Sequence, residues 1–264
     1  MCAFASYYTN LGSAEPDKIN RDEHFHRAES LLNQASLIRR NGAPGEKEEQ
    51  LPVLGMAHLK MARGDTAEAE KLIDAARNLK DDGAENVAPM LWKALFLFRR
   101  AAFGDALQWY RRALRAHPSA PATVRLGIGA CQLRLGQFAE ALKTYEIGLL
   151  SDKRSIELHG NAAMAALKLG CFAQTIEHCD RANELAEFFL ERPNHPTAIK
   201  CLLRRAAARD ALAHFAEAVA DLEKANQLDP GDEVTGEIAT KLAAARRRRE
   251  DAKAERALKR RLRD

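Results

Sequence analysis

Small and apolar residues recur along the chain with a long period. Small residues fall where a second helix would cross a first, at Ala28, Ala69, Ala106, Ala141, Thr175 and Ala218. Their spacings are 41, 37, 35, 34 and 43 residues. Aromatic, glycine and proline residues recur around them in the same order. Self-similarity at such a period predicts a stack of helical hairpins, here six.

Each recurring residue type has a mechanical role in a hairpin. Glycines at Gly64, Gly136 and Gly170 would end the first helix where the backbone reverses. An aromatic residue three positions before the small residue would fill the hairpin, and alanine lets the two helices approach. Prolines at Pro118 and Pro230 would end the second helix. These features, with a period near 34 residues, are typical of tetratricopeptide repeats (TPR).

The pattern predicts an all-α fold, a TPR solenoid that forms a right-handed superhelix with a continuous core and an inner groove lined by the first helices. The array would occupy residues 1–230, with the best repeats in 86–230. The first repeats fit less well, with long joints at Gly12 to Asn20 and Gly42 to Glu49. A helix begins directly at Met1, which suggests a fragment of a longer array.

Residues 231–264 change to one long charged helix, from Glu233 to about Arg263. Its Val234, Ile238 and Leu242 would cover the last hairpin, so we expect a capping helix with a solvated continuation.

Composition agrees with an all-α fold. The 49 alanines far outnumber the 5 valines and 9 isoleucines, so residues that favour sheets are scarce. The uncharged run Met1 to Ala14 is too short to span a bilayer and has no basic start, which argues against a secretory signal. Five scattered cysteines without a CxxC pair predict reduced thiols in a nucleocytoplasmic protein.

The net charge of +4 hides an uneven distribution. Residues 246–264 hold ten Lys/Arg and four Asp/Glu, while the rest of the chain is slightly acidic. This basic tail contains Arg246, Arg247, Arg248, Arg249, Lys259, Arg260 and Arg261. It is compatible with a solvated helix held by pairs such as Arg246–Glu250 and Arg247–Asp251, with a nuclear-import signal, or with a helix that contacts phosphates. Nucleic-acid binding is not expected elsewhere.

No catalytic, metal or cofactor site is predicted. Gly127 and Gly129 lack the third glycine and the preceding strand of a dinucleotide loop, so we expect close helix packing there. His24 and His26 cannot share a helix face, and the spacings of Cys171, His178 and Cys179 match no zinc motif. The sequence therefore predicts a protein that binds other proteins and is not an enzyme.

Residues 5–150 resemble a specific family. The segments ASYYTNLGSAEPDK, RDEHFHRAESLLNQAS and FGDALQWYRRALRAHPSAPATVRLGIGACQLRLGQFAEA are similar to the TPR scaffold subunit of the polymerase-associated-factor (PAF) transcription elongation complex. The run from Pro121 to Ala141 is the most specific part. The resemblance implies a nuclear, non-enzymatic scaffold whose repeats wrap segments of fellow subunits, in a complex that acts with RNA polymerase II.

Residues 157–264 resemble a second family. LHGNAAMAALKLGCFAQTIEHCDRA and AIKCLLRRAAARDALAHFAEAVADLEKANQLDP are similar to TPR co-chaperones, which hold acidic C-terminal tails of heat-shock chaperones in a carboxylate clamp. The resemblance assigns Asn161, Lys200 and Arg204 to three of the five clamp positions, and Leu126 and Ala130 occupy the other two. The co-chaperone resemblance implies the cytoplasm as an alternative to a nuclear localisation.

The residues expected to line the groove favour the first resemblance. They are Leu91, Leu95, Phe98, Leu126, Ala130, Leu133, Met164 and Leu167. An apolar groove suits a helical or extended partner segment, because each Å² of apolar area removed from water contributes about 25 cal/mol. A carboxylate site would need cations at several of these positions. We therefore expect a transcription scaffold with protein partners and without a membrane anchor.

Overall fold

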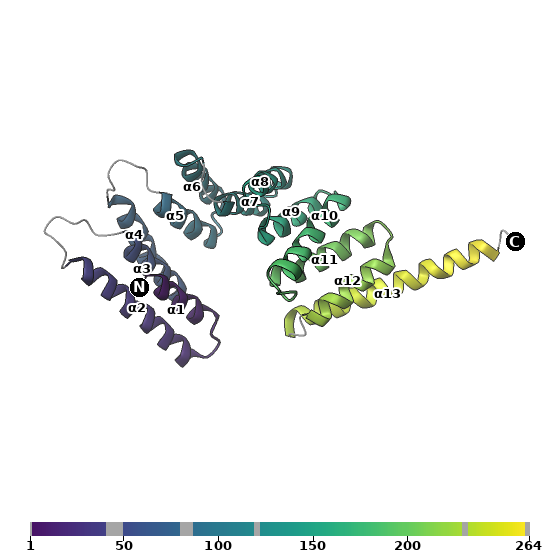
Figure 1. The fold of residues 1–264 in the computed structure, drawn as a ribbon, viewed down its shortest axis with the longest axis horizontal. Coiled ribbons are helices and arrows are strands. Elements are labelled where there is room, and N and C mark those ends of the chain that lie inside the picture. The colour runs from purple at the N-terminus through teal and green to yellow at the C-terminus, as the bar shows by residue number, and fades with distance from the viewer. Residues whose placement is uncertain (1, 41–49, 80–86, 119–121, 229–231, 262–264) are drawn as a thin grey trace. The chain divides into compact units, whose positions relative to one another are not determined.

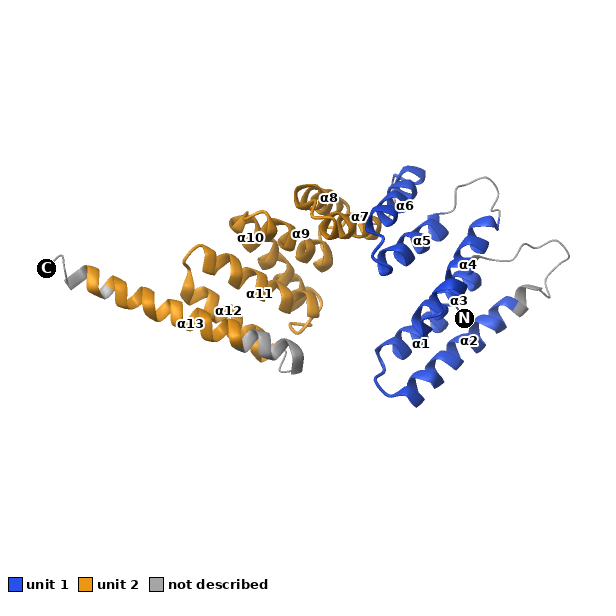
Figure 2. Ribbon diagram, turned by 180° about the vertical axis from the view of Figure 1, so that it is seen from behind, with its two compact units in different colours: residues 1–120 blue, residues 121–264 orange. Residues whose placement is uncertain are grey.

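The chain is described by a computed structural model that covers residues 2–40, 50–79, 87–118, 122–228 and 232–261, with the side chains of 37–40, 50, 232–239, 257, 260 and 261 left out. It divides into two compact units, residues 1–120 (unit 1) and 121–264 (unit 2), coloured separately in Figure 2. The described residues form helices and turns without any strand.

Each unit is a series of antiparallel helical hairpins, labelled in Figure 1. Unit 1 contains α1 (Cys2–Ala14), α2 (Lys18–Arg40), α3 (Gln50–Arg63), α4 (Thr66–Asn78), α5 (Val87–Arg99) and α6 (Phe103–Ala116). Unit 2 contains α7 (Ala122–Arg134), α8 (Phe138–Ser151), α9 (Ile156–Lys168), α10 (Phe172–Glu184), a π-helical turn (Leu185–Phe189), α11 (Pro196–Ala211), α12 (Phe215–Leu228) and α13 (Asp232–Arg261). The predicted six hairpins and long C-terminal helix are confirmed, and the fold is that of TPR proteins.

The small residues that defined the period are among the most buried positions of the hairpins. All six belong to second helices, α2, α4, α6, α8, α10 and α12, and all six have an exposed fraction of 0%. Each first helix packs against the second helix of its own hairpin. Within each unit it also lies beside the first helix of the next hairpin. A larger side chain at these points would push the paired helices apart.

Five of the six hairpin turns share one backbone conformation, and the α1–α2 turn contains no residue with positive φ. Gly64, Gly136 and Gly170 have φ of +88°, +76° and +74°, a region that glycine enters without steric cost. The turns of α5–α6 and α11–α12 use the same left-handed region at Ala101 and Ala213, with φ of +59° and +61°. The sequence pattern identified the first three turns, and the two alanines adopt the conformation without the residue that favours it.

One predicted boundary is wrong. The expected long joint from Gly12 to Asn20 is a short turn, because α1 continues to Ala14 and α2 begins at Lys18. Gly12 is buried inside α1, where a Cβ atom would lie 2.5 Å from Cε1 of Phe25. This glycine therefore serves close helix packing and does not break the helix. The other predicted joint, Gly42 to Glu49, lies outside the described residues.

The C-terminal helix begins as a cap on the last hairpin. Leu242 and Ala245 pack with a buried cluster drawn from α11 and α12, namely Ala206, Ala218, Val219 and Leu222. The predicted capping side chains Val234 and Ile238, like Pro230, lie outside the described set. Pro118 follows the last residue of α6 by two positions, as predicted. No described helix is long and apolar enough to cross a bilayer.

Candidate functional site

The predicted groove residues of unit 1 lie on the first helix of its third hairpin. Leu91, Leu95 and Phe98 occupy α5, which lies beside α3, and all three are half-buried. The ring of Phe98 meets the edge of Phe103 at a centroid distance of 5.2 Å, so this side chain also closes its own hairpin. The helix offers a partly exposed apolar surface.

Unit 2 carries the second and larger group on two neighbouring first helices. Leu126, Ala130 and Leu133 lie on α7, and Met164 and Leu167 lie on α9. All five are half-buried, and α7 and α9 are in contact. Burial of this degree fixes the side chains while leaving apolar area for a partner.

The approach of the helices around α7 depends on a glycine. A Cβ atom at Gly129 would lie 2.4 Å from Cε1 of Tyr145, which is fully buried in α8. The predicted packing role of the LGIGACQ segment is therefore confirmed for Gly129. The aromatic ring occupies the space that a side chain would need, and α7 is held close to α8.

The three residues assigned to a partial carboxylate clamp lie on the next helices of unit 2. Asn161 is half-buried in α9, Lys200 is exposed in α11, and Arg204 is half-buried in α11. Nη1 of Arg204 donates a hydrogen bond to the carbonyl oxygen of Gly160 at 2.8 Å. At least one donor of this guanidinium therefore joins α11 to α9 instead of facing a ligand.

An ion-pair network that joins α10, α11 and α12 was not anticipated from the sequence. Asp221 of α12, with an exposed fraction of 3%, accepts bonds from Arg205 and Arg209 of α11. Arg205 also pairs with Asp180 of α10. Burial alone would lower the pKa of Arg205, but the bonds to Asp221 and Asp180 raise it above its usual value. The network fixes the register of three helices and leaves Arg205 charged.

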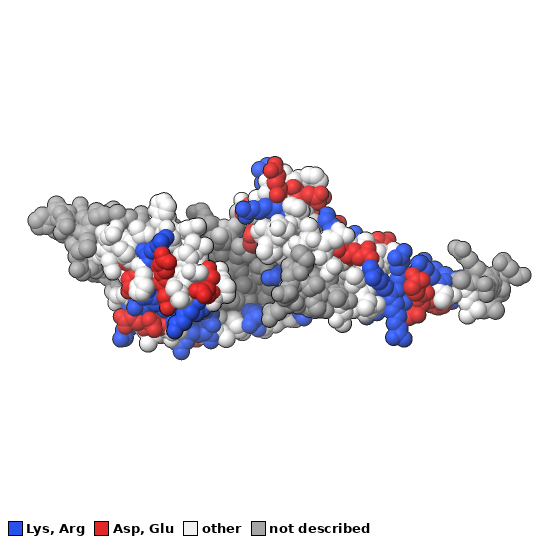
Figure 3. Space-filling model, turned by 90° about the horizontal axis from the view of Figure 1, so that it is seen from below, with Lys and Arg blue, Asp and Glu red and all other residues white. Residues whose placement is uncertain are grey.

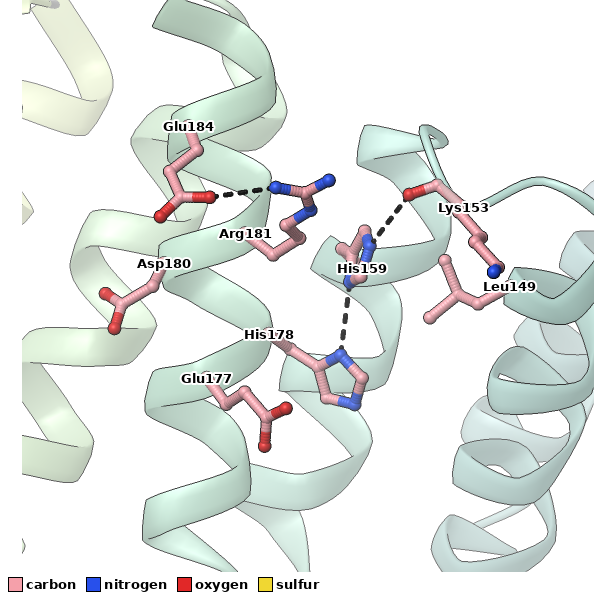
Figure 4. Close-up of a pocket in the computed structure, with 8 residues that line it drawn as sticks. All are labelled: Leu149, Lys153, His159, Glu177, His178, Asp180, Arg181 and Glu184. Atoms are coloured by element: carbon pink, nitrogen blue, oxygen red, sulfur yellow. Dashed lines mark hydrogen bonds and ion pairs between the residues drawn. The ribbon is translucent and has the colours of Figure 1, made fainter.

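A polar pocket of about 460 Å³ lies between α10 and the α8–α9 connection (Figure 4). Its lining comprises Leu149, Lys153, His159, Glu177, His178, Asp180, Arg181 and Glu184. None of the predicted groove residues belongs to it. Three acidic groups, two basic groups and two histidines line the pocket, and Arg181 pairs with Glu184 at 3.0 Å.

The centre of the pocket is a pair of histidines that the sequence analysis did not connect. Nδ1 of His159 and Nδ1 of His178 are 3.2 Å apart, and Nε2 of His159 lies 3.3 Å from the carbonyl oxygen of Lys153. If Nε2 donates to that carbonyl, the neutral ring accepts at Nδ1, so His178 must donate. Burial lowers the pKa of both imidazoles. The pair is a neutral joint between α9 and α10.

The described residues contain no group of three or more side chains suited to a metal ion. Among the cysteines, burial raises the pKa of Cys131 to about 11, which makes its thiol a poor nucleophile at neutral pH.

The basic tail is partly anchored and partly exposed. Arg246 pairs with Glu223 of α12 at 2.7 Å, and Arg248 pairs with Asp210 of α11. The expected bond of Arg246 to Glu250 is wrong, because Glu223 lies within reach and Glu250 pairs with Lys253 at 2.8 Å. Lys259 pairs with Glu255 at 2.6 Å. The side chains of Arg260 and Arg261 lie outside the described set.

Charges of both signs are mixed over the rest of the visible surface. Figure 3 shows basic and acidic side chains side by side on the face that it presents. No single-signed field of the kind that steers a polyanion covers that face.

Comparison with known proteins supports both resemblances. No protein-family model matches the sequence. The chain is 33% identical over 155 residues to "Protein CTR9 homolog" of Arabidopsis thaliana, covering 59% of this chain and 13% of that protein. It is 24% identical over 199 residues to "RNA polymerase-associated protein CTR9" of Caenorhabditis elegans, covering 74% of this chain and 16% of that protein. Mouse "Sperm-associated antigen 1" is 34% identical over 119 residues, covering 42% and 12%. The matched region thus spans less than a fifth of each relative.

Solved structures confirm the fold. The chain superposes on YrrB, a TPR protein with an unusual peptide-binding site, with a TM-score of 0.56 at 16% identity, covering 80% of this chain and 98% of that one. A TPR protein from Parabacteroides merdae superposes with a TM-score of 0.62 at 18% identity, covering 78% of this chain and 76% of that one. The APC/C hetero-tetramer Cut9–Hcn1 gives 0.64 at 13% identity, covering 91% and 42%. The chain therefore has a TPR fold.

Proposed function

We propose that this chain is a non-enzymatic scaffold similar to the TPR subunit of the PAF transcription elongation complex, and that it works in the nucleus with RNA polymerase II. The similarity to two CTR9 proteins, one of them named as RNA polymerase-associated, supports this proposal. The matched region covers only 13% and 16% of those proteins, so the role assigned here is that of the repeat segment alone.

The observation that carries the proposal is the apolar, half-buried surface of the first helices. In unit 2 the five side chains on α7 and α9 carry no charge, and in unit 1 the three on α5 are likewise apolar. A partner segment with regularly spaced Leu, Ile or Phe residues would bury this area, at about 25 cal/mol per Å² of apolar surface.

A co-chaperone role is the alternative, and the clamp geometry weakens it. The similarity to Sperm-associated antigen 1 and the presence of Asn161, Lys200 and Arg204 are in its favour. Leu126 and Ala130 supply neither cation nor amide at the other two positions. Arg204 already donates to the carbonyl oxygen of Gly160. A carboxylate-rich tail would therefore meet Lys200 and the remaining donors of one arginine.

Affinity purification of the tagged chain with mass spectrometry tests the proposal directly. We expect PAF-complex and polymerase subunits to be recovered, and a loss of that recovery in Met164→Asp, because an unpaired charge at the buried contact is costly. Met164 is half-buried, so the thermal midpoint of the variant shows whether the fold is retained.

The matched control is the double variant Lys200→Ala with Arg204→Ala. The scaffold proposal predicts that it still recovers the polymerase-associated subunits. Calorimetric titration with a chaperone-tail peptide ending in EEVD completes the comparison. Micromolar binding that disappears only in the double variant would overturn the proposal in favour of the co-chaperone role.

A further inference from the structure

Two buried thiols meet at the contact between α10 and α11. Cys179 of α10 and Cys201 of α11 are both 0% exposed and belong to one apolar cluster. Ala182 of α10 and Ala198 of α11 belong to the same cluster, and their small side chains let the two helices pack closely. The thiol of Cys179 donates a hydrogen bond to the sulfur of Cys201. The two sulfur atoms are therefore neighbours that are not bonded to each other.

A guanidinium group lies beside this pair. Nη1 of Arg204 and Sγ of Cys201 lie 3.5 and 3.6 Å from the position that a Cβ atom at Gly160 would take, and Arg204 hydrogen-bonds to Cys201. The hydrogen bond from Cys179, followed by Arg204, lowers the pKa of Cys201 against the opposing effect of burial. The bond to Cys201, and then burial, raise the pKa of Cys179. Cys201 therefore loses its proton first, and the thiolate is the nucleophilic form.

A buried cysteine more often serves only as a small apolar side chain. Cys131 of α7 is such a residue, because burial raises its pKa to about 11. The pair differs in two respects: the proton of Cys201 is more easily lost, and a second thiol is in contact with it. An attacking thiolate next to a second cysteine is the combination that thiol oxidation to a disulfide requires.

The pair also lies where a covalent bond has a structural effect. The segment between the two cysteines contains the π-helical turn Leu185–Phe189 and the connection that leads to α11. Phe188 and Phe189 on this segment are 74% and 53% exposed. A disulfide would close the segment into a loop and restrict its freedom in the unfolded chain, which stabilises the folded state.

We infer that Cys179 and Cys201 are a redox site that forms a reversible disulfide on reaction with a peroxide. This chemistry is independent of the protein binding proposed above.

The reaction has two steps. The thiolate of Cys201 attacks one oxygen of hydrogen peroxide, the O–O bond breaks, and the departing hydroxide takes up a proton to become water while Cys201 becomes a sulfenic acid. The sulfur of Cys179 then attacks the sulfenic sulfur, and its proton leaves with the hydroxyl group as a second water while the S–S bond forms. The two thiols lose two electrons and two protons, and the peroxide is reduced to water.

Access to the pair depends on local opening. Both sulfur atoms are shielded from solvent, so peroxide reaches Cys201 when the contact between α10 and α11 opens transiently. The half-buried Arg204 is the neighbour of Cys201 that still borders on solvent. The opening sets the rate of oxidation, and the contact between the thiols sets the product.

Disulfide mapping of the full chain tests the inference. Cys171→Ser is the background, because Cys171 is exposed and would share a tryptic peptide with Cys179. This chain is treated with hydrogen peroxide in native buffer, its remaining thiols are alkylated during unfolding, and its tryptic peptides are analysed by mass spectrometry. We expect the Cys179–Cys201 linkage as the main oxidised product, the loss of two thiols and a higher urea midpoint that a dithiol reductant reverses. Linkage that forms only in urea, or oxidation that leaves both cysteines as thiols, would overturn the inference.

Two further variants in the same background separate the roles of the two thiols. Cys179→Ser keeps a hydrogen-bond donor but removes the resolving thiol, so Cys201 should accumulate as a sulfenic acid that dimedone captures. Cys201→Ser removes the attacking thiol, so Cys179 should show little capture. Equal capture in both variants, or capture confined to Cys201→Ser, contradicts the assignment. Circular dichroism shows whether each variant folds, and the linkage map of Cys171→Ser decides the question if neither does.

Discussion

The two units stabilise a buried charge in opposite ways. In unit 1 the buried group is a cation: Lys93 of α5, 11% exposed at its side chain, lies 3.0 Å from Glu70 and 3.1 Å from Asp74 of α4. Both carboxylates are 37% exposed. Water therefore reaches the acidic partners even though the ammonium group is covered.

In unit 2 the buried group is an anion. Asp221 is 4% exposed at its side chain, and its partners Arg205 and Arg209 are 15% and 22% exposed. These three groups are shielded from water, while Asp180, the second partner of Arg205, is 44% exposed at its side chain. The comparison shows that the contribution of an ion pair to stability depends on how well the remaining group is solvated when its partner is removed. It does not depend on the distance between the two charged groups.

The largest expected effect follows from this difference. Asp221→Ala should destabilise unit 2 by about 3–5 kcal/mol, because it removes the anion that Arg209 pairs with and leaves Arg205 with only the more exposed Asp180. Lys93→Met should cost about 1 kcal/mol or less, since the methionine fills the space of the lysine stem and the acids can be rehydrated. Urea denaturation of the full chain measures both. Equal losses would show that the two networks are equivalent.

A second comparison concerns what the units share. Ala106→Leu in unit 1 and Ala141→Leu in unit 2 should each cost about 1–3 kcal/mol through overpacking, because both alanines are fully buried between paired helices. The half-buried Ala252 on the free end of α13 is the control, and leucine there should be nearly neutral. Denaturation midpoints decide the matter. An unchanged midpoint for either buried alanine would contradict the shared repeat geometry.

The shared features are the ones that sequence reasoning could predict. The small residues at crossing points, the glycines of the turns and the number of hairpins all follow from a period, and a period is visible without coordinates. The 43-residue interval between Thr175 and Ala218 is the longest of the five, and the structure places the π-helical turn Leu185–Phe189 within it. The predicted groove residues fall on first helices, and their role in binding stays a prediction.

The unshared features escaped prediction for a physical reason. Arg205, Asp180 and Asp221 come from three helices, and which of many charged residues meet depends on helix rotation to within a fraction of a turn. His159 and His178 are nineteen positions apart and meet because α9 and α10 pack antiparallel. The repeat period does not encode such pairings. Predicting them would require the rotation of each helix about its own axis, which the period does not determine.

The histidines give the two units different responses to pH. Burial lowers the pKa of His159 and His178 in unit 2; in unit 1 burial, and then the charge of Arg99, lowers that of His58. The imidazoles bind protons more readily in the unfolded chain than in the folded chain. The free energy of unfolding is therefore unaffected by these histidines above about pH 6.5 and falls as the pH drops below that value.

The response should be larger in unit 2, where a doubly protonated pair would place two cations 3.2 Å apart. Urea midpoints at about pH 7.5 and about pH 5.5 measure it. We expect His178→Gln to reduce the acid sensitivity more than His58→Gln does. A larger reduction from His58→Gln would reverse the assignment.

The smallest expected effect is a stabilisation shared by both units. Ala101 and Ala213 hold left-handed backbone that costs an L-residue about 1–2 kcal/mol, and glycine removes this cost while adding about 0.4–1 kcal/mol of unfolded-state entropy. Ala101→Gly in unit 1 and Ala213→Gly in unit 2 should therefore each stabilise by about 0.5–1 kcal/mol. Ala243→Gly, at an exposed position inside α13, is the matched control and should destabilise by about 1 kcal/mol. Thermal midpoints of the three variants test the sign. If the two turn variants fell together with the control, the positive φ at Ala101 and Ala213 would not be the conformation of the folded chain, and the equivalence of these turns with Gly64, Gly136 and Gly170 would be lost.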